Sequence, residues 1–150
     1  MTPSDPQRRD DFVVLVAEDD AHDIVAIRRA WRTLGIPNPL TIVNDGEACL
    51  NYLQGCTPGS GTALPGLLLL DLHMPRLDGL GALRAIRANA ATAHLPVVIL
   101  TTSQAEEDRV RSYALGANAY IVKPVGFENF TAALRTIHEF WHLAERPGER

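Results

Sequence analysis

The chain has 150 residues, of which 46 % are apolar, and it carries a formal net charge of −4 at pH 7. This size and composition predict one globular domain with a workable core, and the acidic balance argues against nonspecific nucleic-acid binding, which requires a basic face. No apolar run approaches the roughly 20 residues of a membrane span, and the first ten residues lack the apolar core of a signal peptide. We therefore expect a cytoplasmic protein without a nucleic-acid or membrane partner.

Short apolar runs alternate with helical patterns along the chain, between a polar tail at 1–11 and a short tail at 145–150. In chain order, the pattern predicts a strand at Phe12–Ala17, a helical stripe at Ile24–Leu34, a strand at Leu40–Val43, a helix at Glu47–Leu53, a long loop at Gln54–Gly66, a strand at Leu67–Leu70, a helix at Asp78–Asn89, a strand at Pro96–Leu100, a helix at Ala105–Leu115, a strand at Ala119–Val122 and a helix from Phe127 to about Ala144. Five strands alternating with five helices predict a doubly wound parallel sheet with three αβα layers in the single domain 12–144.

The run Leu67–Leu70 is the most informative of the strands, because it is apolar throughout and ends at one carboxylate, Asp71. It is too short for a free-standing helix and does not alternate like a half-exposed strand, so we interpret it as a strand that is covered on both faces. A charged residue at the carboxyl end of such a strand lies where open α/β sheets bind their ligands. An isolated Asp in this position could also do no more than cap the following turn.

Polar residues of matched chemistry follow the other strands. Glu18, Asp19 and Asp20 follow the first strand, Thr101 follows the fourth, and Lys123 follows the fifth. In the flavodoxin-like strand order 2-1-3-4-5, the acidic residues of strands one and three meet at one crevice, where their mutual repulsion favours binding of a divalent cation such as Mg²⁺, with Mn²⁺ as a possible substitute. Together these groups predict a phosphoryl-transfer site with Asp71 as an oxygen nucleophile.

Lys123 is the only lysine among 14 basic residues, which indicates that a compact ammonium is required at this position. Cys49 and Cys56 have no metal-ligand partners at a useful spacing, and we expect them to be reduced thiols. Asp20 lies one residue beyond the acidic pair and is interpreted as a helix cap.

With these residues in place, the stretch from about Phe12 to Phe140 resembles the receiver domains of two-component response regulators. The resemblance rests on Glu18-Asp19, on Asp71 followed by Met74-Pro75 and Asp78-Gly79, on Thr101, and on Tyr120 through Lys123-Pro124. It implies that Asp71 accepts a phosphoryl group from a sensor histidine kinase, and that the protein catalyses its own phosphorylation and slow dephosphorylation without being an enzyme for another substrate.

The resemblance also implies a role for each site residue. It implies that Asp19, Asp71 and the backbone carbonyl of His73 bind the metal with Glu18 as an outer acid, that Thr101 and Tyr120 report phosphorylation, that Lys123-Pro124 is a cis peptide, and that His73 and Ser103 tune the phosphoryl lifetime.

Finer features resemble the small stand-alone regulators associated with phytochrome-type sensor kinases. These features are the Gly/Pro-rich loop Gln54–Gly66, the Leu-Thr-Thr-Ser run at 100–103 and Glu139-Phe140-Trp141 in the last helix. We therefore expect signalling through the receiver surface, with a bacterial phytochrome as a candidate kinase. Two alternatives stay open, a Mg²⁺-dependent phosphatase of the haloacid dehalogenase type and a degenerate receiver that binds partners without phosphorylation. Against the phosphatase, His73 stands where that family requires a second acid.

The last helix predicts a homodimer. Its apolar stripe consists of Phe130, Ala133, Leu134, Ile137 and Trp141, and we expect it to pack on the sheet. Phe140 lies about 80° from that stripe, at roughly 100° per residue, near Leu143 and Ala144. We therefore expect Phe140 and Leu143 to contact a second copy of the chain, unless Phe140 folds against its own domain.

Overall fold

The computed structural model describes residues 12–143, in which five strands alternate with five helices as predicted. They are β1 (Val14–Ala17), α1 (Ala21–Leu34), β2 (Leu40–Val43), α2 (Gly46–Gln54), β3 (Leu67–Leu70), α3 (Gly79–Ala88), β4 (Val97–Thr101), α4 (Glu106–Ala114), β5 (Ala119–Val122) and α5 (Phe127–Leu143). The bounds agree with the prediction to within two residues, except that α1 begins three residues before the predicted stripe. The predicted helix end at Ala144 and both tails lie outside the described residues.

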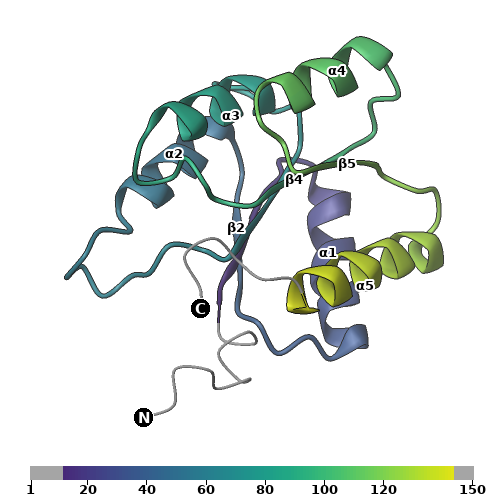
Figure 1. Ribbon diagram of the computed structural model, residues 1–150. Helices are drawn as coiled ribbons and strands as arrows, with labels where there is room; N and C mark the ends of the chain where they lie inside the picture. Colours follow the sequence, from purple (N-terminus) through teal and green to yellow (C-terminus); the bar gives the residue numbers. More distant parts are fainter. Residues whose placement is uncertain (1–11, 144–150) are drawn as a thin grey trace.

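The five strands form one parallel sheet in the order β2-β1-β3-β4-β5, which confirms the predicted flavodoxin-like topology. Helices α1 and α5 cover one face of the sheet, while α2, α3 and α4 cover the other, so the molecule has three layers (Figure 1). Within the described residues, no helix is long and apolar enough to cross a membrane.

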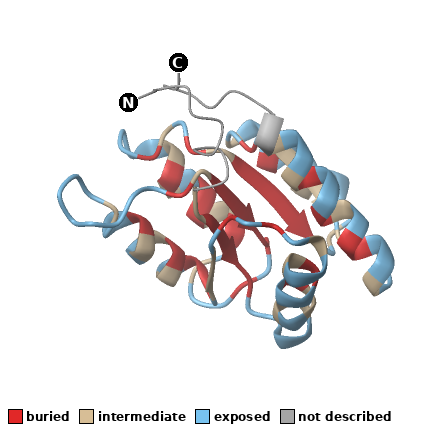
Figure 2. Cartoon of the chain, turned by 90° about the horizontal axis from the view of Figure 1, so that it is seen from below, coloured by how far each residue is buried: buried red, intermediate tan, exposed pale blue. Residues whose placement is uncertain are grey.

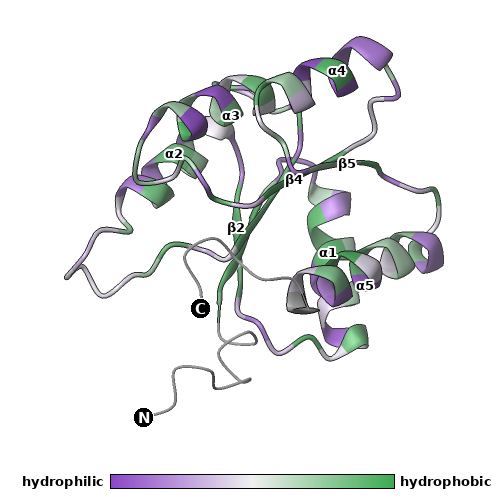
Figure 3. Ribbon diagram, viewed as in Figure 1, coloured by the Kyte–Doolittle hydropathy of each residue, from purple (hydrophilic) through white to green (hydrophobic). Residues whose placement is uncertain are grey.

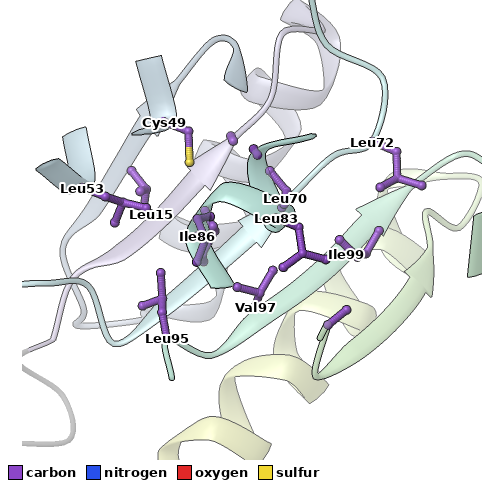
Figure 4. Packing of buried hydrophobic residues seen from close by; sticks show 14 of the residues in the cluster. Leu15, Cys49, Leu53, Leu70, Leu72, Leu83, Ile86, Leu95, Val97 and Ile99 are labelled. Carbon is purple, nitrogen blue, oxygen red and sulfur yellow. The ribbon is translucent and has the colours of Figure 1, made fainter. Parts of the chain in front are cut away.

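Each face of the sheet has its own apolar core, and this explains why the strands show no alternation in the sequence. Leu68 and Leu70 pack toward α2 and α3, whereas Leu67 and Leu69 pack toward α1 and α5, because successive side chains of a strand point to opposite faces. Figure 4 shows the first of these cores, in which Leu83 and other residues of α3 meet the strands. All four leucines of β3 are at most 2 % exposed, and each contributes about 1.5–3 kcal/mol of hydrophobic stabilisation.

The pattern of burial follows from this two-sided packing. The central strands are buried along their whole length, whereas the helices are exposed on their outer sides (Figure 2). The hydropathy colouring agrees, because the strands are almost uniformly hydrophobic and the helices carry both kinds of residue (Figure 3). Within the central strands, polar side chains are therefore confined to the positions where the chain leaves the sheet.

Three helices begin at an aspartate that directly follows a strand or loop on the carboxyl side of the sheet. The side chains of Asp20, Asp45 and Asp78 accept hydrogen bonds from backbone N–H groups in the first turns of α1, α2 and α3. Such caps satisfy helix donors that would otherwise have no partner, and each stabilises a helix by about 1 kcal/mol. The predicted cap at Asp20 is thereby confirmed.

Helix α3 begins in direct contact with the end of β3. The N–H of Gly79 donates to the carbonyl oxygen of Leu72 at 2.9 Å, and a Cβ atom at position 79 would overlap the backbone carbonyl of Asp71. Because the overlap is with backbone and not with a movable side chain, only glycine fits at this position. Gly79 thus fixes how closely α3 approaches the residue that ends β3.

We predict that Gly79→Ala lowers the free energy of unfolding by about 1–3 kcal/mol, because the added methyl group forces the backbone near Asp71 to shift. The matched control is Gly81→Ala, where the added methyl group first meets the end of the Leu77 side chain, which can move. Urea unfolding followed by circular dichroism measures both variants. Equal stability of the two variants would contradict the prediction.

Candidate functional site

Acidic residues from β1 and β3 meet at the carboxyl edge of the sheet. Glu18 and Asp19 follow β1, Asp71 follows β3, and one carboxylate oxygen of each lies within 4.8 Å of the others. Backbone hydrogen bonds extend the sheet to this edge, because Glu18 N–H donates to Val43 and Asp71 N–H donates to Ala17. Glu18 and Asp71 are buried, whereas Asp19 is exposed. Three clustered carboxylates are hard oxygen ligands, and they fit a cation such as Mg²⁺.

Lys123 joins this acidic cluster from the end of β5. Its Nζ atom donates to Glu18 Oε1 at 2.6 Å, to Asp23 Oδ2 at 2.7 Å and to Asp71 Oδ2 at 3.4 Å, and its side chain is only 5 % exposed. The backbone N–H of Lys123 donates to the carbonyl of Thr101 at 2.7 Å, which continues the β4·β5 pairing. The sheet therefore holds the ammonium at the predicted crevice.

The acidic groups of the cluster outnumber its single ammonium. Burial raises the pKa of Glu18 to about 7, against the opposing effect of its hydrogen bond from Lys123. Burial alone would lower the pKa of Lys123, but its hydrogen bonds to Asp23 and Glu18 and the charge of Asp71 outweigh burial and raise it. The ammonium therefore stays charged, yet it cannot neutralise all the carboxylates around it. This excess of negative charge favours binding of a divalent cation.

Asp23 was not singled out from the sequence, although it contacts Lys123 as closely as Glu18 does. Asp23 lies in the first turn of α1 and not at a strand end, so it lacks the contrast with an apolar run that marks the other acids. The short connection between β1 and α1 could have indicated its role. Because α1 begins four residues after β1, its first turn must lie beside the same crevice.

Thr101, Ser103 and Tyr120 are linked at the start of the β4–α4 loop. Thr101 ends β4 and is fully buried, and its hydroxyl oxygen accepts from the N–H of Ser103 at 3.2 Å. The Tyr120 hydroxyl donates to the carbonyl of Ser103 at 3.0 Å, and the Ser103 hydroxyl donates to Asp108 in α4 at 2.6 Å. Ser103 therefore connects both predicted switch residues to helix α4.

The β3–α3 loop folds back over Asp71. The N–H of His73 points toward Asp71 Oδ1 at 3.5 Å, while the His73 side chain is exposed. The loop is tied to the start of α2 by two contacts, one between Arg76 Nε and Asp45 Oδ2 at 2.8 Å and one from Gly46 N–H to the Leu77 carbonyl at 3.1 Å.

Arg76 has a left-handed backbone conformation with φ of 66°, and it is the only non-glycine residue with positive φ among residues 12–143. A side chain in this conformation costs free energy, so the surrounding contacts must hold it. The Asp45–Arg76 ion pair was not predicted from the sequence, since the two residues are 31 positions apart.

The predicted cis peptide is not present. The bond between Lys123 and Pro124 is trans, as are all other peptide bonds in the described part of the chain. Trans is the isomer that X–Pro bonds ordinarily favour, by about 0.5–1 kcal/mol. The long lysine side chain reaches all three carboxylates with the trans bond, so the placement of its ammonium does not depend on the cis isomer.

The predicted dimer residues lie on α5. Phe140 is 60 % exposed, and its ring contacts that of Trp141 edge to face with centroids 4.7 Å apart. The stripe of α5 packs on the sheet as predicted, with Phe130, Leu134 and Ile137 buried. The side chain of Leu143 lies outside the described part of the structure.

Comparison with known proteins agrees with this geometry. The model of the response regulator receiver domain family matches residues 14–135. The probable methanogenesis regulatory protein FilR2 of Methanothrix harundinacea is 36 % identical over 135 residues, which are 90 % of this chain and 86 % of FilR2. The response regulator Rcp1 of Synechocystis is 34 % identical over 129 residues, which are 86 % of this chain and 88 % of Rcp1.

Two solved structures extend the comparison. The phosphorylated cyanobacterial phytochrome response regulator RcpA has a TM-score of 0.84 at 32 % identity, covering 92 % of this chain and 99 % of RcpA. The Mn²⁺-bound form of Rcp1 has a TM-score of 0.81 at 33 % identity, covering 91 % of this chain and 99 % of Rcp1. The fold, the site and these relatives together show that the chain belongs to the response regulator receiver domain family.

Proposed function

We propose that this receiver domain accepts a phosphoryl group on Asp71 from a sensor histidine kinase in a Mg²⁺-dependent reaction, and that it signals through its own surface. The observation that carries the proposal is the contact of a buried strand-end carboxylate, Asp71, with a buried ammonium, Lys123, beside two further acids. This combination supplies both a nucleophile and the charges that stabilise a transferring phosphoryl group.

The chemistry follows from the groups at the crevice. A carboxylate oxygen of Asp71 attacks phosphorus, and the bond from phosphorus to the donor's nitrogen or oxygen breaks with its electron pair. Lys123 and the Thr101 hydroxyl then donate hydrogen bonds to phosphoryl oxygens. Asp19, Asp71 and the His73 carbonyl would hold Mg²⁺, with Glu18 as an outer acid, and the cation would neutralise the charge on those oxygens.

Phosphorylation would be reported by a two-state shift of Thr101 and Tyr120. A hydrogen bond from Thr101 to the phosphoryl group draws the β4–α4 loop toward Asp71, and Ser103 transmits that movement because it contacts both Tyr120 and Asp108. His73 and Ser103 stand at the mouth of the site in this scheme and would tune the phosphoryl lifetime.

A phytochrome-type kinase is the proposed source of the phosphoryl group. RcpA is a cyanobacterial phytochrome response regulator, and its structure matches 92 % of this chain. Rcp1 was solved with Mn²⁺ bound, which supports a divalent cation at the acidic cluster here.

We predict that Asp71→Asn abolishes phosphoryl uptake without unfolding the protein, because the residue ends a strand at the crevice and does not fill the core. Its free energy of unfolding should equal or exceed that of the wild type, since one repelling carboxylate is removed. The measurement is intact-protein mass after treatment with acetyl phosphate. A variant that gained phosphate at the wild-type rate would contradict the assignment.

The same assay separates the alternative functions. A stable mass gain in the wild type supports a phosphoacceptor, turnover of acetyl phosphate without a mass gain supports a phosphatase, and no reaction supports a degenerate receiver. With excess chelator, the wild type should gain no mass, and phosphorylation under that condition would refute the metal requirement.

We predict that Lys123→Arg slows phosphoryl uptake at least about tenfold, which corresponds to roughly 1.4 kcal/mol of transition-state stabilisation. The charge is kept, but a planar guanidinium cannot take the place of a compact ammonium that donates to three carboxylates in a closed site. The control is Arg135→Lys on the exposed side of α5, which should leave the rate unchanged. Wild-type kinetics in Lys123→Arg would show that the site does not require lysine at this position.

A homodimer through α5 is the second part of the proposal. Phe140 leaves a large aromatic surface in water while the neighbouring stripe of α5 is already buried on the sheet. A second copy of the chain would cover that surface, and such a contact gives a receiver one way to convert phosphorylation into a change of assembly.

Light scattering at high micromolar concentration tests the dimer. We predict that the wild type is dimeric and that Phe140→Glu is monomeric, because a buried carboxylate would have no partner in the interface. Ala132→Glu adds the same charge at an exposed position two turns earlier on α5 and should leave the dimer intact. A monomeric wild type, with and without phosphorylation, would refute the dimer.

A further inference from the structure

Asp23 is the acidic residue of the site that the phosphoacceptor chemistry described above does not use. Its Oδ2 atom lies 2.7 Å from Lys123 Nζ, and it comes from the first turn of α1, whereas Glu18 and Asp71 come from strand ends. The side chain of Asp23 is 31 % exposed, so the contact lies at the solvent side of the buried ammonium.

The three hydrogen bonds of the ammonium are unequal. An ammonium has three N–H donors, and here three carboxylates accept them. The bonds to Glu18 and Asp23, at 2.6 and 2.7 Å, have the length of strong charge-assisted bonds, whereas the bond to Asp71 at 3.4 Å is long and weak. Two acids therefore fix the ammonium, and the phosphoacceptor holds it least.

We propose that Asp23 is a positioning residue for phosphoryl transfer, which acts by holding the Lys123 ammonium beside Asp71 without letting the two pair closely. This inference rests on the proposed function. When the phosphoryl group arrives, the weak third hydrogen bond passes from Asp71 to a phosphoryl oxygen, while the bonds to Glu18 and Asp23 remain. The ammonium keeps all its protons, and no proton transfer is needed.

Without the Asp23 carboxylate, the ammonium loses one of its two strong acceptors. It then moves toward the nearest remaining carboxylate that lacks a short bond to it, which is Asp71. A close ion pair lowers the reactivity of the Asp71 oxygen and must be broken before a phosphoryl oxygen can take its place. The consequence is slower phosphorylation, even with saturating Mg²⁺.

The chain provides a matched control for charge. Asp20 stands in the same turn as Asp23 and carries the same charge, but its side chain accepts a hydrogen bond from the N–H of Asp23 as the cap of α1. Asn caps a helix about as well as Asp does, so Asp20→Asn removes a charge and keeps the cap. Any difference between Asp23→Asn and Asp20→Asn reports the contact with Lys123 and not the loss of one negative charge.

The first test is a double-mutant cycle on the rate of phosphorylation by acetyl phosphate at saturating Mg²⁺. We expect Asp23→Asn to lower the rate at least fivefold, and Asp20→Asn to change it less than twofold. In a Lys123→Ala background, Asp23→Asn should have no further effect. Equal rates for the two Asn variants, or additive effects of Asp23→Asn and Lys123→Ala, would overturn the role of Asp23.

The second test does not depend on phosphorylation. Because Lys123 is the only lysine in the chain, labelling lysine with ¹⁵N at Nζ gives a single side-chain ammonium signal. An ammonium held by two strong hydrogen bonds exchanges its protons slowly, so the signal should be visible at neutral pH in the wild type and in Asp20→Asn, and should be lost by exchange in Asp23→Asn.

The outcomes separate the two proposals. If the wild type takes up no phosphoryl group, the proposed function fails. If the wild type is phosphorylated but Asp23→Asn keeps the ammonium signal and the wild-type rate, only the positioning role of Asp23 fails.

Discussion

The carboxyl edge of the sheet depends on one buried cation. Lys123 contacts the carboxylates that follow β1 and β3 and one in the first turn of α1, and each of them is more than 50 residues away from it in the sequence. Burying such a charge is unfavourable unless hydrogen bonds replace the lost water, and burying the acids without the ammonium would be equally unfavourable. The buried ammonium and the carboxylates around it therefore offset one another's cost of burial, and its short contacts with Glu18 and Asp23 contribute most to this.

The fold makes this arrangement possible by keeping polar groups away from the interior of the sheet. The central strands β1, β3 and β4 pack apolar side chains against helices on both faces, so they have no solvent-exposed face on which a polar side chain could lie. Within these strands, polar side chains are consequently restricted to the carboxyl ends and to the loops that follow. Because all strands are parallel, their carboxyl ends lie at the same edge, and residues such as Glu18, Asp71, Thr101 and Lys123 are collected there.

This constraint explains what the sequence could predict. A buried strand is recognisable as an apolar run, and a polar residue at its end is recognisable by contrast, so the topology and the convergence of Glu18, Asp19, Asp71 and Lys123 were predicted correctly. The functional roles of these residues remain predictions. Asp23 was missed because a helical aspartate looks like any solvated residue until the orientation of α1 is known. The cis bond predicted before Pro124 was wrong, because it was inferred from family resemblance and the local sequence does not determine the isomer.

The link between the β3–α3 loop and the start of α2 has a consequence for communication within the domain. Arg76 and Leu77 bind Asp45 and Gly46, and a Cβ atom at position 46 would overlap the backbone of Leu77, so the β3–α3 loop and the start of α2 are in van der Waals contact. A ligand held over Asp71 by the β3–α3 loop would therefore stiffen the first turn of α2. Thermodynamic linkage makes such coupling reciprocal, so a protein that bound the first turn of α2 would also change the affinity of the crevice for that ligand.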